Sequence, residues 1–420
     1  MISKLKAAVA GLALMASPAL AVDLEFYFPV AVGGAAANTI EELTNEYIAA
    51  NPGLNIDAIY AGSYQDTVAK ALTAARGGNA PQLSVIASVD MYTLFDEDLI
   101  HAFDDFATTD EDKAWLKSFY PSFMENSMID GKTYGIPFQR YTPVLYYNKE
   151  AFAEAGLSDA PATWEEMKDY AGQLTKKDDA GNVTQWGVRI PSSGFPYWLF
   201  QGLTTSNGAT LVTDGGTRTN FDGPKVVEAL EYLVSLSKDG VMAPGIIEWG
   251  ATPKAFFEGQ TAMMWTSTGN LTNVRKNAPF EFGVAMLPAN ERRGAPTGGG
   301  NFYLFKGGSE EETKAAFDFI KWISQPTQAA KWSIATGYVA PSPSTWESKE
   351  MKAYAADFPP ALVARDQLEY AVAELSTYEN QRVTRIFNDA LHAAITGEKS
   401  AADALAEAQV KADAVLKAYR

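Results

Sequence analysis

Cysteine is absent from the chain and histidine is scarce, since only His101 and His392 are present. Without cysteine the chain has no disulfides, no zinc–thiolate site, no cysteine nucleophile and no lipid attached to an N-terminal cysteine. With only two histidines, a histidine-rich metal site or a histidine-based catalytic triad is not expected. We therefore expect no metal and no cofactor, and the composition disfavours a hydrolytic enzyme.

Long hydrophobic runs are also scarce. One apolar stretch, residues 7–14, follows Lys4 and Lys6 and precedes the small residues Ala19 and Ala21. It is shorter than the roughly 20 residues that a membrane-spanning helix needs. A basic start, a short apolar run and an A-x-A end are typical of a secretory signal peptide. The sequence predicts a signal peptide over residues 1–21, cleaved after Ala21, and a mature protein that works outside the cytoplasm.

Basic residues are outnumbered by acidic ones, 34 to 51, which gives a formal net charge of −17. Such a surface is a poor partner for nucleic acid and for anionic membranes. It does not argue against a small anionic ligand, because a buried site responds to its local donors. Hydrophobic residues make up 47% of the chain and aromatic residues 12%, so the chain can bury two or three large cores.

Strands and helices are expected to alternate in the first hundred residues, because alternating apolar patterns are followed by helical periodicity. The expected order is strand 24–28, helix 39–50, strand 55–60, helix 64–76 and strand 83–87. This βαβαβ order is typical of a parallel, doubly wound sheet, which binds ligands at the carboxyl ends of its strands. A second α/β pattern begins with a strand at 144–147 and includes a strand at 262–265, and the last third is mainly helical. Because no low-complexity linker is present, we expect two lobes joined by short crossovers.

Polar residues near the expected strand ends are candidates for ligand binding. Ser88 and Asp90 follow the third strand, where they could face a ligand or cap the next helix. Arg140 could donate to a phosphate or carboxylate, or lie on the surface as a solvated arginine. The glycine-rich turn at 33–38 could offer backbone N–H groups to an anion, or be a tight turn without a ligand.

Several aromatic residues lie in or beside segments rich in glycine, proline and serine, where core packing is less expected. Their rings could stack on the C–H surface of a polyol or sugar, with packing in the core as the alternative. They are Trp186, Phe195, Tyr197, Trp198 and Trp249. None of the polar turns nearby places a nucleophile beside a base.

Short motifs spread over nearly the whole chain resemble a known family. They are YAGSY at 60–64, GNAP at 78–81, TPVLYYNK at 142–149, FEGQTAM at 257–263, GG at 298–299 and TGY at 336–338. In this order they resemble the extracellular solute-binding proteins of ABC importers, the large family that includes maltose-type binding proteins. Within that family the motifs are most similar to those of the sn-glycerol-3-phosphate-binding periplasmic proteins.

The resemblance implies an α/β, two-lobed periplasmic binding protein fold of type II, similar to maltose-binding protein, with a hinge and a ligand cleft between the lobes. We expect the hinge near residues 137–142 and return crossings near Trp265 and Gly298. The expected segments are 22–138 and 263–298 for the first lobe, and 139–262 and 299–420 for the second.

The resemblance also implies which residues contact ligand. Tyr64, Ser267, Gly299 and Tyr338 match the family's motif positions. Elsewhere the chain departs from the motifs. Where the family has a glutamate this chain has Ser88, followed two residues later by Asp90, and where the family has a serine it has Tyr141. Residues 27–34 replace the family's Trp-His-Ser-x-x-Gly opening. The family's C-terminal arginine falls on Arg382 or Arg385. The expected ligand-binding residues are Tyr64, Ser88, Asp90, Arg140, Tyr141, Ser267, Gly299, Tyr338, Arg382 and Arg385.

The expected function is that of a periplasmic, monomeric solute-binding protein that delivers a small polyhydroxylated solute to a membrane permease. The expected ligand is sn-glycerol 3-phosphate or a glycerophosphodiester, and the departures from the motifs leave a sugar or oligosaccharide as the alternative. A secreted glycosidase or lyase is a remote alternative. Acidic residues such as Asp104 and Glu125 are plentiful, but no spacing fixes a carboxylate pair at a catalytic separation.

Overall fold

The strands expected near the N-terminus form one sheet in the computed structural model, which describes residues 22–29 and 35–420. β1 (Val22–Phe28) pairs in parallel with β2 (Leu54–Tyr60) and with β3 (Leu83–Ala87). β15 (Gly298–Leu304) lies between β3 and β6 (Ile136–Tyr141) and is antiparallel to both. The order β2-β1-β3-β15-β6 confirms the predicted parallel arrangement for the first three strands.

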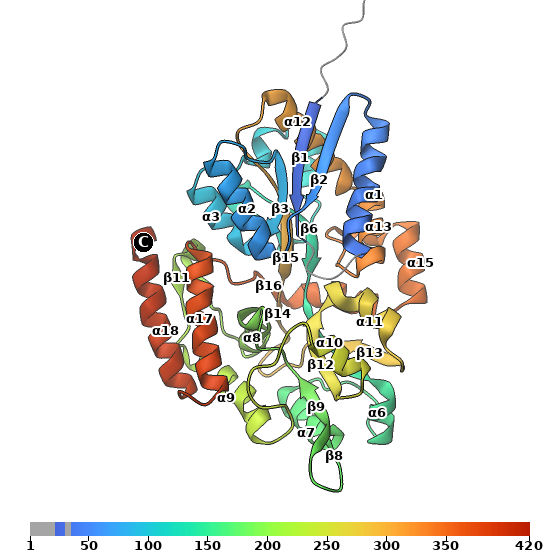
Figure 1. The fold of residues 1–420 in the computed structure, drawn as a ribbon, viewed down its shortest axis with the longest axis vertical. Coiled ribbons are helices and arrows are strands. Elements are labelled where there is room, and N and C mark those ends of the chain that lie inside the picture. The colour runs from blue at the N-terminus through green and yellow to red at the C-terminus, as the bar shows by residue number, and fades with distance from the viewer. Residues whose placement is uncertain (1–21, 30–34) are drawn as a thin grey trace, which may run out of the picture.

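Helices cover both faces of this first sheet (Figure 1). α1 and α13 lie on one side of the strands, and α2 and α3 lie on the other. The buried residues Ile40, Leu43 and Tyr47 form the inner stripe of α1, and the Tyr47 ring lies 5.1 Å from that of Phe319. The helices around this sheet are α1 (Ala35–Ala50), α2 (Tyr64–Arg76), α3 (Met91–Asp96), α4 (Asp110–Leu116), α5 (Pro121–Met124), α12 (Glu310–Ile323) and α13 (Pro326–Thr336).

The second lobe is built on a sheet with the order β13-β7-β12-β9-β8. Its strands are β7 (Pro143–Asn148), β8 (Lys176–Lys177), β9 (Val183–Arg189), β12 (Thr261–Ser267) and β13 (Phe282–Ala285). Most of the remaining helices surround it: α6 (Lys149–Glu154), α7 (Trp164–Leu174), α8 (Pro196–Ser206), α9 (Pro224–Lys238), α10 (Thr252–Phe257) and α11 (Leu271–Asn277).

The C-terminal part returns toward the second lobe. α14 (Pro343–Trp346), α15 (Lys349–Asp357) and α16 (Ala361–Gln367) lead to β16 (Ala371–Val372), which pairs with β14 (Ala295–Pro296) between the lobes. α17 (Asn380–Ile395) and α18 (Ala401–Leu416) then pack against each other and against α9 (Figure 1). Two short hairpins, β4–β5 (Met128–Ile129 with Lys132–Thr133) and β10–β11 (Val212–Thr213 with Arg218–Thr219), complete the described strands.

The sheets correct the predicted lobe segments. β12 and β13 belong to the second sheet, whereas segment 263–298 was expected in the first lobe. β15 belongs to the first sheet, although it was expected in the second lobe, and so does all of β6. β12 is buried along its whole length and pairs with both β7 and β9. A fully buried strand has the same apolar pattern in either sheet, so the sequence predicts the strand but not its partners.

The crossovers follow from this assignment. The chain leaves the first sheet at Thr142, within the expected hinge at 137–142, and re-enters it at Gly298 as expected. No crossing into the first sheet occurs at Trp265, because both β12 and the next strand, β13, stay in the second sheet. Among the described residues, no helix combines the length and the apolar character needed to cross a bilayer.

Two glycines on neighbouring elements of the second lobe give opposite expectations for stability. A Cβ added at Gly187 in β9 would lie 1.9 Å from the carbonyl oxygen of Ala171 in α7, so Gly187→Ala should destabilise the protein by about 1–3 kcal/mol or more. Gly172 in α7 has no atom closer than 3.9 Å to such a Cβ. Gly172→Ala should therefore stabilise the helix by about 0.5–1 kcal/mol. Urea unfolding of both variants checks this, and equal effects of the two would contradict the packing.

Candidate functional site

A cavity of 190 Å³ lies between the two lobes. The first lobe contributes residues at the start of α2 and at the carboxyl end of β3, where the sequence predicted a ligand. The second lobe contributes the start of α8 and the first half of α17. The lining residues are Tyr64, Gln65, Ala87, Val89, Asp90, Gly194, Phe195, Tyr197, Asn380, Gln381, Thr384, Arg385 and Asn388.

Three helices begin at this cavity, because the lining includes the first residues of α2 and α17 and residues around the start of α8. The start of α2 is fixed by a capping box, in which the Ser63 hydroxyl accepts from the Asp66 N–H at 3.1 Å. The N-terminal end of a helix carries a positive partial charge. The cavity is therefore suited to a ligand with anionic or hydroxyl oxygens.

Three of the predicted tyrosines meet beside the cavity. Tyr64 donates a hydrogen bond to Oε1 of Gln139 at 2.9 Å. The rings of Tyr141 and Tyr338 lie 5.6 Å apart, and both phenols are near enough to Tyr64 to influence its pKa. Tyr338 reaches this point because the N–H of Val339 donates to the carbonyl of Arg140 at 2.8 Å. Burial raises the pKa of all three phenols, so they remain protonated near neutral pH.

A row of aromatic rings continues from Tyr141 into the second lobe. The ring of Tyr141 lies 5.1 Å from that of Trp198, which lies 6.0 Å from Trp249, and Phe195 lies 5.6 Å from Trp249. Phe195 and Tyr197 line the cavity, which is one of the two settings that the sequence left open for them. Trp186 is not part of the lining. It lies in β9, where it pairs with Thr261, the first residue of β12.

The glycines at the start of β15 allow these side chains to approach the backbone. At Gly299, where φ is +109°, a Cβ would lie 1.8 Å from the Gln139 carbonyl oxygen. A Cβ at Gly298 would lie 2.5 Å from the Tyr141 ring, and one at Gly300 would lie 3.0 Å from the Tyr64 ring. The predicted residue Gly299 thus lies at the centre of the tyrosine cluster, where a larger residue does not fit.

Arg140 does not line this cavity. It follows Gln139 in β6, and successive side chains of a strand point to opposite faces. Its guanidinium is fully buried and donates to Oδ1 of Asn301 and Oγ1 of Thr297, both at 3.2 Å, while lying over the ring of Phe123. The prediction of Arg140 as a direct ligand contact is therefore not supported by its position.

Glu374 is a buried residue of the site that the sequence did not single out. Its Oε1 accepts a hydrogen bond from the Tyr197 hydroxyl at 2.7 Å, although Glu374 itself lines the larger cavity described below. Burial raises the pKa of Glu374 to about 8, although Tyr197, Arg140 and Gly299 oppose the shift. No local sequence pattern marks this glutamate, which follows the short strand β16.

The other predicted residues are divided between the cavity wall and its surroundings. Asp90 lines the cavity, and its Oδ1 accepts from Nε2 of Gln381 at 2.8 Å across the lobes. Ser88 is completely buried and its hydroxyl has no partner among the described residues. Ser267 uses its hydroxyl to accept from the N–H of Gly269 at 2.9 Å.

The two candidate arginines on α17 differ in position. Both arginines are exposed, but Arg385 is part of the cavity lining and Arg382 is not. The family's C-terminal arginine is thus better matched in space by Arg385. The glycine-rich turn at 33–38 was also a candidate, but Gly33 and Gly34 lie outside the described residues.

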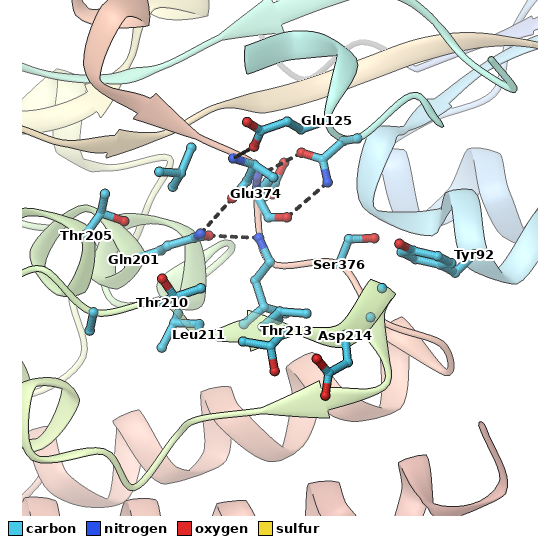
Figure 2. Close-up of a pocket in the computed structure, with 18 residues that line it drawn as sticks. Tyr92, Glu125, Gln201, Thr205, Thr210, Leu211, Thr213, Asp214, Glu374 and Ser376 are labelled. Carbon is cyan, nitrogen blue, oxygen red and sulfur yellow. Dashed lines mark hydrogen bonds between the residues drawn. The ribbon is translucent and has the colours of Figure 1, made fainter. Parts of the chain in front are cut away.

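A second, larger cavity of 420 Å³ is lined in part by residues 372–376 (Figure 2). Hydrogen bonds hold this segment in place (Figure 2). The Glu374 N–H donates to Oδ1 of Asn126 at 2.8 Å, and the Glu374 carbonyl accepts from Nδ2 of Asn126 at 3.0 Å. The Gln201 side chain donates to the Ala373 carbonyl and accepts from the Leu375 N–H. The lining contains Glu125, Asp214 and Glu374 but no lysine or arginine. The smaller cavity, with Arg385, is therefore the better anion site. The described part of the chain contains no group of histidine and acidic residues that could hold a metal.

The burial of Asp90 predicts a pH effect on stability. Burial raises its pKa from 3.8 to about 6, so the folded state favours the protonated form. This contribution is fully present below about pH 3.8 and is lost as the pH rises through about 6, a change on the order of 3 kcal/mol. Asp90→Asn cannot titrate, so the stability of wild type relative to the variant should fall between pH 4 and 7. Urea unfolding across this range checks it, and parallel curves would contradict it.

Known proteins are similar to this chain in sequence and in fold. The model of the bacterial extracellular solute-binding protein family matches residues 42–360. The sn-glycerol-3-phosphate-binding periplasmic protein UgpB of Pectobacterium atrosepticum is 26% identical over 431 residues, with 98% of this chain and 96% of the relative covered. UgpB from Mycobacterium tuberculosis, solved in complex with glycerophosphocholine, gives a TM-score of 0.82 at 23% identity, covering 94% of this chain and 99% of that one.

The sugar-binding protein MalE from Xanthomonas citri gives a TM-score of 0.81 at 21% identity, covering 95% of this chain and 98% of that chain. These likenesses confirm the predicted two-lobed periplasmic binding protein fold. The matched proteins bind solutes and are not enzymes, which also confirms that part of the prediction. This chain belongs to the family of bacterial extracellular solute-binding proteins.

Proposed function

We propose that this protein is the periplasmic binding component of an ABC importer, and that it captures sn-glycerol 3-phosphate or a glycerophosphodiester between its lobes. The observation that carries the proposal is the composition of the smaller cavity. Three helix starts and Arg385 provide positive potential for a phosphate, while Tyr64, Tyr197 and Phe195 provide hydroxyls and ring faces for a glycerol group. The name of the Pectobacterium relative, an sn-glycerol-3-phosphate-binding protein, supports the same ligand class.

Capture by closure of the lobes fits the contacts across the cleft. The Ser376 hydroxyl donates to the Val89 carbonyl at 2.7 Å, and Gln381 donates to Asp90. In this proposal the lobes are the two sheets with their helices, and they rotate about the crossover at Thr142 and the paired strands β14 and β16. A membrane permease would then receive the ligand from the closed, monomeric form.

A sugar is the second candidate, and a specific observation favours it. The row of aromatic rings and the acceptor side chains of Asp90 and Asn388 would suit the hydroxyls of a sugar as well as those of glycerol. The size of the cavity favours a small solute over an oligosaccharide, because 190 Å³ is below the range of about 300–1,000 Å³ for drug-sized ligands.

Arg385 tests the phosphate assignment. We expect Arg385→Gln to weaken binding of sn-glycerol 3-phosphate and of glycerophosphodiesters by about tenfold or more, because a charge-assisted hydrogen bond is lost. Binding of a neutral sugar should change little. Isothermal titration with both ligand classes measures the difference.

Arg382→Gln is the matched control, since Arg382 lies exposed on the same helix outside the cavity. It should retain wild-type affinity. Tight binding of a neutral sugar by wild type, without binding of any phosphorylated polyol, would refute the proposed ligand and favour the sugar.

Export tests the proposed location. The basic start at Lys4 and Lys6 and the A-x-A end at Ala19–Ala21 predict cleavage after Ala21. N-terminal sequencing of protein recovered from the periplasm should begin at Val22. Recovery of an uncleaved chain starting at Met1 would argue against it.

A further inference from the structure

Gln139 is a completely buried side chain that joins the tyrosine cluster to the end of β1. Its Oε1 accepts a hydrogen bond from the Tyr64 hydroxyl at 2.9 Å, and its Nε2 donates to the carbonyl of Pro29 at 3.1 Å. In the sheet Gln139 lies opposite Gly300, and the Tyr64 ring lies against the same glycine, where a Cβ would be 3.0 Å from it. Gln139 therefore holds the hydroxyl end of Tyr64 at the end of the first sheet.

The Pro29 carbonyl fixes which way the Gln139 amide points. A peptide carbonyl can only accept hydrogen bonds, so the end of the amide that faces it must be the NH2 group. The amide oxygen then faces Tyr64, and this oxygen can only accept. The single proton of the Tyr64 hydroxyl is therefore used inside the protein. Burial raises the pKa of Tyr64, so this proton is retained near neutral pH.

Tyr64 can consequently serve a ligand only as an acceptor. Tyr64 is part of the lining of the 190 Å³ cavity between the lobes. A phenol oxygen whose proton is already used accepts a hydrogen bond from an O–H or N–H group, whereas a phosphate or carbonyl oxygen brings it no proton. Turning the Tyr64 proton toward such an oxygen would leave the buried Gln139 acceptor unpaired, which costs free energy.

We infer that Gln139 is a positioning residue that makes Tyr64 an acceptor, so that Tyr64 selects a ligand hydroxyl over an oxygen that carries no proton. Arg385, in the lining of the same cavity, can only donate. The cavity thus offers opposite hydrogen-bonding polarity to the hydroxyl end and the phosphate end of a glycerol phosphate. This inference rests on the proposed function, because it concerns how the same class of ligand is recognised in the same cavity.

The test compares a hydroxyl, an acceptor-only group and a hydrogen atom at each of the two hydroxyl positions of sn-glycerol 3-phosphate. At C2 the acceptor-only ligand is dihydroxyacetone phosphate, and the ligand without the oxygen is propane-1,3-diol monophosphate. At C1 they are the 1-deoxy-1-fluoro analogue and propane-1,2-diol 1-phosphate. At one of the two positions, isothermal titration of wild type should show both analogues binding about tenfold or more weakly than the hydroxyl, and within about twofold of each other, because neither donates a proton there.

Two variants assign this order of affinities to the pair of residues. Tyr64→Phe removes only the hydroxyl, so the preference for the ligand hydroxyl at that position should disappear. Gln139→Met removes the acceptor for the Tyr64 proton with little change in volume. Tyr64 can then donate to the ligand, so the acceptor-only analogue should bind about fivefold or more tightly than the analogue without the oxygen. A purely structural role would weaken all the ligands together and leave their order unchanged.

Gln139→Glu is the conservative rescue. Burial favours the protonated form of its carboxyl, which can donate to the Pro29 carbonyl and accept from Tyr64 as the amide does. The wild-type order should therefore return in this variant. Gln185→Met is the matched control, because Gln185 is also buried and donates to a carbonyl, that of Leu174, but is not part of the cavity lining. It should keep the wild-type order.

Three results would overturn the inference alone. They are equal wild-type affinity for the hydroxyl and the acceptor-only group at both positions, a hydroxyl preference that survives in Tyr64→Phe, and an unchanged order in Gln139→Met. If Gln139→Met does not fold, Tyr64→Phe and Gln139→Glu still decide. Absence of wild-type binding to every phosphate in the series would overturn the proposed ligand class and the inference with it.

Discussion

The insertion of β15 between β3 and β6 is the constraint on which the ligand site depends. All seven residues of β15 are buried, and the strand runs antiparallel to both neighbours. Its N-terminal end therefore lies beside the carboxyl ends of β3 and β6, where parallel strands present ligand-binding loops. Three consecutive glycines at this end leave space for the rings of Tyr64, Tyr141 and Trp198. A side chain at any of these positions would collide with the backbone or the aromatic cluster.

The same packing buries charge that would otherwise be solvated. Arg140 is fully buried, and Glu374 and Asp90 are nearly so, yet none of them forms a direct ion pair among the described residues. Uncompensated burial of charge costs free energy, and groups with strongly shifted pKa values are concentrated at functional sites. Here Asp90 accepts from Gln381 and Glu374 accepts from Tyr197, so both shifted carboxyls lie where the two lobes meet.

Much of the fold could be predicted from local patterns, whereas the pairing of strands could not. The spacing of apolar residues predicted the strands β1, β2 and β3, because apolar and polar residues alternate where one face of a strand is buried. β12 was predicted as a strand but assigned to the wrong lobe, since a fully buried strand does not reveal its neighbours. Only long-range pairing, between β12 and β7 for example, decides the lobe to which such a segment belongs.

The candidate site shows the same division between local and long-range information. Tyr64, Gly299 and Tyr338 come from motifs that resemble a known family, and the structure brings them together. The alternation of β6 was a signal that could have separated Arg140 from Tyr141, because adjacent strand residues face opposite sides. Glu374 had no comparable signal, since its hydrogen bond with Tyr197 joins residues that are far apart in sequence.

The acidic composition of the protein does not oppose an anionic ligand, because the relevant field is local. The acidic residues are spread over a surface on which many pair with lysine or arginine, and water and salt screen exposed charges within about 10 Å at 0.1 M ionic strength. Inside the cleft, three helix starts and Arg385 provide positive potential instead. A ligand oxygen in the cleft responds to these nearby donors more than to the net charge of the chain, because exposed charges farther away are screened.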